Sequence, residues 1–336
     1  MIQRHLALFL LLVATLHAHR PNQLDTLHHY LSLKVHEYST IIDQQLSHLL
    51  LGESNQTHCA IHPPTQEDNR SAIERFFQDE KFLRDSGESF VRLRSDTLLS
   101  QGGVYEHTTH FSTQLPLPLS RQHFKLFVEN LTRENASNLL HNRSDDETPQ
   151  AEIGIHYFLS HLYGIESKYS LAMRGINPFI RAKYSRLFEV GEWRIEPTQS
   201  FEYSVEHAFE EESNLYFDYP LSSQKLLRLQ LHRKSTSEDK GMEYALSAEY
   251  FWAISHKRGL KLSQSFWGDT GYTYTQSDGT ERSFEGIHNY ITAMSYRANI
   301  WREWLFYEII PAVNFHQANH YRANYSLHFL VDFYFR

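Results

Sequence analysis

The stretch Tyr325-Ser-Leu-His-Phe-Leu-Val-Asp-Phe-Tyr-Phe335, which Arg336 follows, decides the fold. Successive side chains of a β-strand point to opposite faces, so a period of two in hydrophobicity indicates a strand. Here every second residue is bulky and apolar, while the intervening row is mostly polar or amphipathic. The apolar face of the predicted strand consists of Tyr325, Leu327, Phe329, Val331, Phe333 and Phe335.

The same alternation recurs through the chain after Ser89. Each block carries apolar side chains on one face and polar or charged side chains on the other. Repetition of this two-faced pattern over many short segments is typical of a transmembrane β-barrel, although each segment alone carries little signal. The clearest blocks are residues 91–97, 124–129, 180–185, 201–206 and 227–232.

With this patterning, the terminal strand resembles the closing strand of bacterial outer-membrane β-barrels, which commonly ends on an aromatic residue, often Phe. Arg336 departs from that pattern by one residue. The resemblance is to the class and not to a particular transporter or enzyme. It implies an all-β fold, namely a transmembrane antiparallel up-and-down β-barrel whose apolar terminal row faces the membrane. It also implies the Gram-negative outer membrane, contact with its lipid, and recognition by the barrel-insertion machinery.

The connections between the blocks predict about fourteen strands, with twelve as the alternative, because such barrels have an even number and bring both chain ends to the periplasm. If the last connection, residues 316–320, is external, the long charged connections all lie on that side. Residues 208–214 are also predicted to be a connection. The long connections are 133–150, 234–241 and 275–286, and the short ones on the periplasmic side are 190–192, 255–259 and 300–303.

The chain divides into three parts. Residues 6–18 are an apolar run preceded by Arg4, which is too short to span a membrane and has the layout of a secretory signal. We therefore expect a signal peptide at residues 1–18, a helical periplasmic segment at 19–88, and the barrel at 89–336.

The segment before the barrel has helical periodicity. Apolar residues recur at three-to-four spacing between residues 20 and 51, which predicts an amphipathic helix. Ser71-Ala-Ile-Glu74 is a capping box that opens a second, short helix through Phe76 and Phe77. The segment could be a periplasmic arm, a plug, or a helix that binds a periplasmic partner or a second copy through residues 20–51. The alternative is an extension packed against the inner rim of the barrel.

Composition argues against several classes of partner and cofactor. The formal charge of −8 is mild, and charges of both signs are mixed, so we do not expect a nucleic acid as partner. Cys59 is the single cysteine, which excludes a disulfide framework and a cysteine metal cluster. The 22 histidines are scattered and form no His-Glu-x-x-His motif, so we expect neither a metal site nor another cofactor.

The polar rows of the predicted strands contain charges of both signs. These side chains could line a water-filled pore, or they could pair across a narrow interior and fill it. The predicted lumen-lining residues are Arg92, Arg94, Asp96, Lys125, Glu129, Arg181, Lys183, Arg194, Glu196, Glu202, Glu206, Arg228, Glu243, Glu249, Glu308 and Asp332.

Three functions fit these patterns. The leading hypothesis is a channel or solute-passing pore with a charged lumen. The second is a barrel enzyme that hydrolyses lipid or peptide, because Ser326 and His328 share a face of the terminal strand and could form part of a nucleophilic site with Asn324 as orienting group. No Gly-x-Ser-x-Gly elbow accompanies them. The third is a structural or assembly role through the N-terminal helix.

Overall fold

The structure is a computed structural model of the chain, and it describes the barrel and isolated parts of the N-terminal segment. In the N-terminal segment it describes Asp25, Thr26, residues 28–34, Glu37, residues 40–41, Gln44, Ile73 and residues 76–77. In the barrel it describes residues 90–101, 103–116, 124–130, 151–162, 164–205, 208–237, 241–275, 280–300 and 302–335. The predicted signal peptide, residues 1–18, lies outside the described residues.

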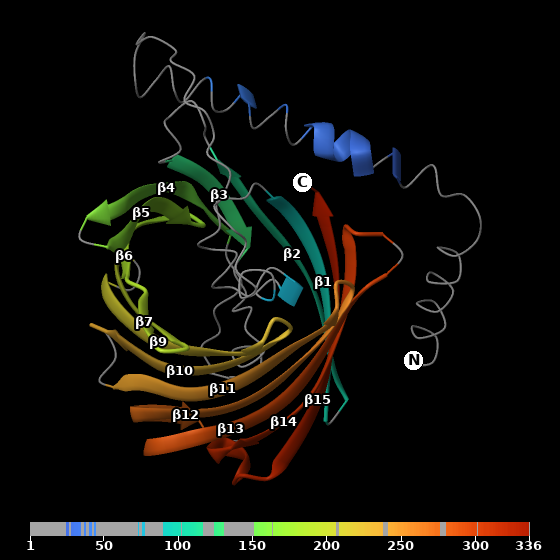
Figure 1. Cartoon of the computed structure of the whole chain (residues 1–336). Coiled ribbons are helices and arrows are strands. Elements are labelled where there is room, and N and C mark those ends of the chain that lie inside the picture. Colours follow the sequence, from blue (N-terminus) through green and yellow to red (C-terminus); the bar gives the residue numbers. More distant parts are fainter. Residues whose placement is uncertain are drawn as a thin grey trace.

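The wall is a single sheet of 15 strand segments in which sequence neighbours are also spatial neighbours (Figure 1). The segments are β1 (Phe90–Ser100), β2 (Val104–Pro116), β3 (Phe124–Asn130), β4 (Ala151–Leu162), β5 (Ile165–Arg174), β6 (Asn177–Ser185), β7 (Phe188–Val190), β8 (Trp193–Ser204), β9 (Ala208–Ser222), β10 (Lys225–Thr236), β11 (Met242–Ser255), β12 (Arg258–Thr275), β13 (Glu281–Asn299), β14 (Leu305–His316) and β15 (Ala323–Phe335). A short 3-10 helix, η2 (Gln317–Asn319), joins the last two strands.

The sheet closes into a ring of fourteen strands. The first and last strands pair antiparallel, with Arg94 opposite Asp332. β6 and β7 both pair with β8, one after the other along its length, so they form one strand that is interrupted at residues 186–187. The pairing of β6 with β8 leaves no edge in the ring. The predicted fold class is confirmed, with fourteen strands and not twelve.

The connections at the two ends of the ring differ in length. We call the end where β1 begins and β15 ends the C-terminal rim; its turns include the two-residue connections 191–192, 223–224 and 256–257. The predicted long connections 133–150, 234–241 and 275–286 all join strands at the opposite rim.

One predicted connection was wrong. Residues 208–214 begin β9 and continue the wall, and the turn precedes them. Glu210, Glu211 and Glu212 looked like a loop because three adjacent carboxylates obscure the alternation. In the strand, Glu210 forms an ion pair with Lys234 on β10, and Glu211 forms one with Arg233 on the same strand.

The two faces of the ring differ in exposure, most clearly along β5, β11 and β15. On β15 Tyr325 is 61% exposed, whereas Asp332 in the alternate row is 1% exposed. The exposed row is the bulky apolar row of the terminal strand, and the same holds for Leu171 and Ile180 on other strands, at 66% and 57%. A band of exposed apolar side chains around a closed ring fits hydrocarbon outside.

The N-terminal helix contacts the C-terminal rim. Residues 28–34 are helical. His28 stacks on Trp304 and Phe335, with ring centroids 4.5 and 5.2 Å apart, and its Nε2 lies 2.8 Å from the Tyr334 carbonyl oxygen. Asp25 forms an ion pair of 2.5 Å with Arg302. These contacts are with the end of the last strand and with the turn before β14, and they fix one end of the segment beside the rim (Figure 1).

Ring closure predicts resistance to detergent. Every strand has two neighbours, so opening the wall requires a whole ladder of hydrogen bonds to break at once. We expect the purified protein in SDS to migrate faster on a gel before boiling than after. The same mobility in both samples, with the unheated one already unfolded by circular dichroism, would contradict a closed ring.

Candidate functional site in the interior of the barrel

The buried side chains of the wall are mainly polar or charged, with a buried apolar cluster on β11 to β15. A closed sheet has only two faces, and the exposed one is apolar, so the buried row faces the enclosed interior. The charged side chains of this row form ion pairs between neighbouring strands. Charges removed from water must be paired, and the register of the strands decides which partners meet.

One group of ion pairs lies near the C-terminal rim, and we call it the terminal cluster. Arg94 donates two hydrogen bonds to Asp332, of 2.6 and 2.9 Å. Arg297 on β13 donates to the same carboxylate at 2.7 Å and to Glu308 at 3.0 Å. Asp332 and Arg297 are 1% and 0% exposed. The cluster therefore links the first strand with the last three.

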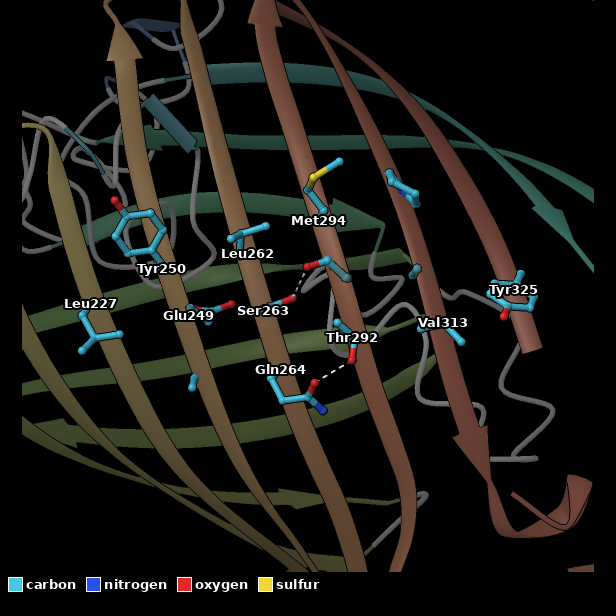
Figure 2. A pocket seen from close by; sticks show the side chains of 14 residues that line it. Leu227, Glu249, Tyr250, Leu262, Ser263, Gln264, Thr292, Met294, Val313 and Tyr325 are labelled. Carbon is cyan, nitrogen blue, oxygen red and sulfur yellow. Dashed lines mark hydrogen bonds between the residues drawn. The ribbon is translucent and has the colours of Figure 1, made fainter. Parts of the chain in front are cut away.

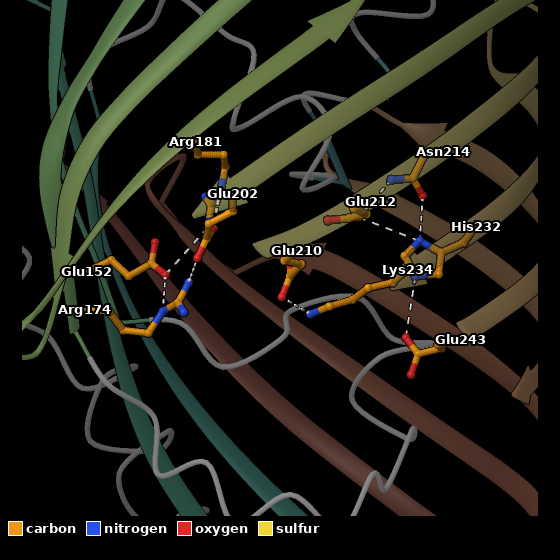
Figure 3. Close-up of polar contacts among 10 residues, drawn as sticks. All are labelled: Glu152, Arg174, Arg181, Glu202, Glu210, Glu212, Asn214, His232, Lys234 and Glu243. Atoms are coloured by element: carbon orange, nitrogen blue, oxygen red, sulfur yellow. Dashed lines mark hydrogen bonds and ion pairs between the residues drawn. The ribbon is translucent and has the colours of Figure 1, made fainter. Parts of the chain in front are cut away.

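Two further clusters lie on other parts of the wall. Arg228 donates to both carboxylate oxygens of Asp218, at 2.7 and 3.0 Å, and both residues are 1% exposed. On β4, β5 and β8, Arg174 bridges Glu152 and Glu202 at 2.8 and 2.9 Å (Figure 3). In both clusters the register places an arginine opposite or beside a carboxylate on an adjacent strand.

A fourth cluster lies toward the opposite rim, on β9 to β11. Lys234 pairs with Glu210 at 2.9 Å, and His232 lies 3.6 Å from Glu243 (Figure 3). The His232 ring also lies 2.9 Å from the Asn214 amide oxygen. The side chains of Lys234 and Glu210 are 17% and 21% exposed, so this cluster is more accessible than the terminal cluster.

The predicted lumen-lining residues fall into three groups. Glu129 and Glu206 have side chains outside the described residues. Partly buried side chains belong to Arg181, Lys183, Arg194, Glu196 and Glu249. Buried side chains belong to Arg92, Arg94, Asp96, Lys125, Glu202, Arg228, Glu243, Glu308 and Asp332.

Sequence reasoning missed several members of the clusters. Arg297 lies in a stretch of β13 where Ala293 and Ser295 share its row, so the alternation in hydrophobicity is weak there. The predicted lumen-lining set also lacks Asp218, Glu152 and Arg174, because no clear period-two block includes them. Counting in twos from the tight turns would have placed Asp218 on the same row as Tyr216.

The candidate catalytic pair, Ser326 and His328, is not joined by a hydrogen bond. His328 is 3% exposed, and its Nδ1 lies 3.6 Å from the Asp96 carboxylate across the β1–β15 pairing. Within the part of the chain that the structure describes, neither ring nitrogen of His328 forms a hydrogen bond, so Ser326 does not donate to it. A nucleophilic serine needs that hydrogen bond to a base. In the same described part, no group of three or more His, Cys, Asp or Glu side chains could hold a metal ion.

A groove of about 580 Å³ lies on the outer face and is separate from this interior (Figure 2). Leu262, Met294 and Tyr325 are among its lining residues. The Thr292 hydroxyl donates to the Gln264 amide oxygen at 2.5 Å, which satisfies two polar side chains on this otherwise apolar surface. The groove lies on the exposed face and is not part of the interior described above.

No family model matches the chain, and no curated protein matches it. Solved structures with a similar architecture include the outer-membrane channel DcaP of Acinetobacter baumannii, with 8% identity, a TM-score of 0.42, and coverage of 74% of this chain and 96% of that one. They also include opdK of Pseudomonas aeruginosa, with 9% identity, a TM-score of 0.40, and coverage of 73% and 98%. OmpT of Vibrio cholerae has 6% identity, a TM-score of 0.41, and coverage of 74% and 97%. Likeness at this level says nothing about what this chain passes or cleaves.

The terminal cluster predicts a large stability difference between two carboxylate variants. Asp332→Ala leaves two buried arginines without their shared carboxylate, and breaking a buried pair in this way costs roughly 3–5 kcal/mol. Glu189→Ala removes a carboxylate that is 66% exposed and 3.8 Å from Arg194, and exposed pairs contribute about 0–1 kcal/mol.

The measurement is the urea midpoint of unfolding in detergent micelles or lipid vesicles for both variants and the unsubstituted protein. We expect Asp332→Ala to unfold at much lower urea and Glu189→Ala to match the unsubstituted protein. Equal midpoints for all three proteins would contradict the assignment of the terminal cluster as a buried network.

Among the described residues, no helix is long and apolar enough to cross a membrane. The closed antiparallel ring, its even number of strands, its apolar exterior and its polar interior are those of a transmembrane β-barrel. The chain therefore has the fold of the bacterial outer-membrane β-barrels as a class, as the terminal strand predicts.

Proposed function

We propose that the protein is a channel of the Gram-negative outer membrane that passes ions or small polar solutes through a charged lumen. The C-terminal rim, with its short turns, then faces the periplasm, and the opposite rim faces the outside. Outer-membrane lipid contacts the apolar face, and the barrel-insertion machinery recognises the terminal strand during biogenesis.

The observation that supports the proposal is that the ion pairs join neighbouring strands of the wall and do not cross the barrel. Arg94 pairs with Asp332 on the adjacent strand, and Arg228 pairs with Asp218 on the adjacent strand. Arg297 and Asp332 lie two strands apart in the ring. Each pair therefore runs along the wall. A barrel filled by its own side chains would instead pair charges across its diameter.

The size of the ring supports the same conclusion. Side chains fill the interior of an eight-stranded barrel, whereas barrels of 16–18 strands leave an aqueous channel. A fourteen-stranded ring is close to the larger class. Lateral pairing holds the charges against the wall, so they need not meet across the axis, which is what a path for water and solute requires.

The test of this function is electrical. Reconstitution of the full chain into planar lipid bilayers is expected to give discrete current steps, whatever fraction of the time the channel is open. A folded, inserted protein that gives no steps, including in the rim variants described below, would overturn the channel assignment.

The accessible cluster near the opposite rim predicts a change of ion selectivity. Lys234→Gln removes a positive charge beside Glu210 and is expected to increase the preference for cations, while Glu210→Gln is expected to decrease it. The measurement is the reversal potential in a tenfold KCl gradient, which should move in opposite directions for the two variants.

Arg233→Gln is the matched control. Arg233 is the neighbour of Lys234 on the same strand, but its side chain is on the outer face, 49% exposed. Its loss changes the net charge by the same amount without changing the wall of the lumen, so the reversal potential should not move. An equal shift for Arg233→Gln and Lys234→Gln would show that the ions do not pass along the inner row.

A further inference from the structure

An apolar layer lies on the inner face of the wall at the C-terminal rim. We call it the aromatic cup, and it is formed by Leu226 on β10, Phe251 on β11, Gly259 on β12 and Phe306 on β14. Phe251 and Leu226 are 0% and 1% exposed. Most of the buried row is polar, and a second apolar cluster, which includes Trp267, Ile291 and Leu330, lies on the inner face of β11 to β15.

Side chains from before the barrel occupy the aromatic cup. Ile73, Phe76 and Phe77 have helical backbone. Phe77 packs edge-on against Phe251 with ring centroids 5.3 Å apart, and Phe76 packs edge-on against Phe306 at 6.2 Å. Ile73 and Phe77 are 3% and 7% exposed, which is the burial of core residues.

Gly259 leaves the room that these rings need. A Cβ at this position would lie 2.5 Å from Cζ of Phe77 and 2.6 Å from Cε1 of Phe76. Any side chain at position 259 would therefore push at least one ring away. The wall and the segment are complementary in shape at this point, and contacts with four different strands hold the segment inside the rim.

Ionic side chains lie directly beyond the cup. The Arg297 guanidinium lies 4.7 Å from the centroid of the Phe306 ring, and the Arg228 guanidinium lies 5.6 Å from the centroid of the Phe251 ring. A solute leaving the charged interior at this side of the rim meets an apolar layer. Apolar constrictions close channels because water leaves them.

We propose that the segment carrying Ile73, Phe76 and Phe77 is an intramolecular plug that closes the channel at the periplasmic rim by occupying the aromatic cup. The inference rests on the proposed channel function. Release of the segment from the cup opens the path, and its return closes it. The alternative is an extension that packs on one side of the rim and leaves the path open beside it.

The test compares variants that weaken the contact with one that does not. The double variant Phe76→Ala/Phe77→Ala removes the rings, and Gly259→Ala displaces them by adding a methyl group to the wall. Burial of one aromatic side chain changes a docking equilibrium by about 10-fold or more. We expect the single-channel open probability to rise by at least that factor in the double variant and to rise in Gly259→Ala.

Phe266→Ala is the matched control. Phe266 lies on β12 in the outward-facing row and packs edge-on against Tyr290 with centroids 5.7 Å apart. It loses the same ring without changing the cup, so its open probability should equal that of the unsubstituted protein. Faster unheated migration in SDS identifies which variants have a closed barrel.

A second readout does not depend on current. Ser263, in the buried row of β12, is replaced by Cys in a Cys59→Ser background, and a membrane-impermeant maleimide is added on the side of the C-terminal rim. Labelling is expected to be slow with the segment in place and at least 10-fold faster in the double variant.

The outcomes separate the two proposals. Frequent current steps in the unsubstituted protein, with equal open probability and labelling in all variants, overturn the plug and leave the channel standing. Absence of steps from every folded variant overturns the channel, and labelling still decides whether the segment blocks the rim. Low open probability that the double variant raises, with Phe266→Ala unchanged, supports both.

Discussion

Hydrocarbon offers no hydrogen-bond partner to a backbone amide, and the architecture of this protein follows from that constraint. Every strand in the wall must have a neighbour on both sides. The ring meets the requirement in two places where it could fail: the first strand pairs with the last, and β6 pairs with β8. Even the interruption at residues 186–187 leaves both β6 and β7 paired with the same neighbour.

Closure then determines the chemistry of the two faces. Once the apolar row faces outward, charges in the other row are removed from bulk water and need partners close by. Arg94, Arg297 and Arg228 find them on adjacent or next-adjacent strands, so their side chains lie along the wall. Lateral pairing removes the need for charges to meet across the axis. The charged wall and an open path are therefore compatible, and the apolar layer at one rim becomes the place where the path can close.

Much of the fold could be predicted because its signal is local. Alternation along one strand requires no knowledge of its neighbours, and tight turns such as 191–192 and 256–257 are marked by their own residues. The prediction from this alternation was wrong at Glu210 to Glu212, because three consecutive carboxylates hide the pattern. These residues belong to β9 and not to a loop.

The sequence predicted which residues face the interior, but it did not predict which of them form ion pairs with one another. A partner such as Asp332 for Arg94 lies 238 residues away, so it depends on the register at which the ring closes. Arg297 was missed because small side chains flank it in the buried row. The capping box before Phe76 predicted a helix there, but a short apolar helix fits many surfaces, and only the missing side chain at Gly259 shows where this one lies.

The pairing of β1 with β15 also has a consequence for incompletely synthesised chains. Arg94 lies on the first strand of the ring, and Asp332 lies on β15, the strand that completes the seal. A polypeptide that stops before β15 would lack both the carboxylate and the sealing ladder. Arg94 and Arg297 would then lie in the interior without their shared carboxylate, so an incomplete copy would have an uncompensated positive charge as well as an open edge.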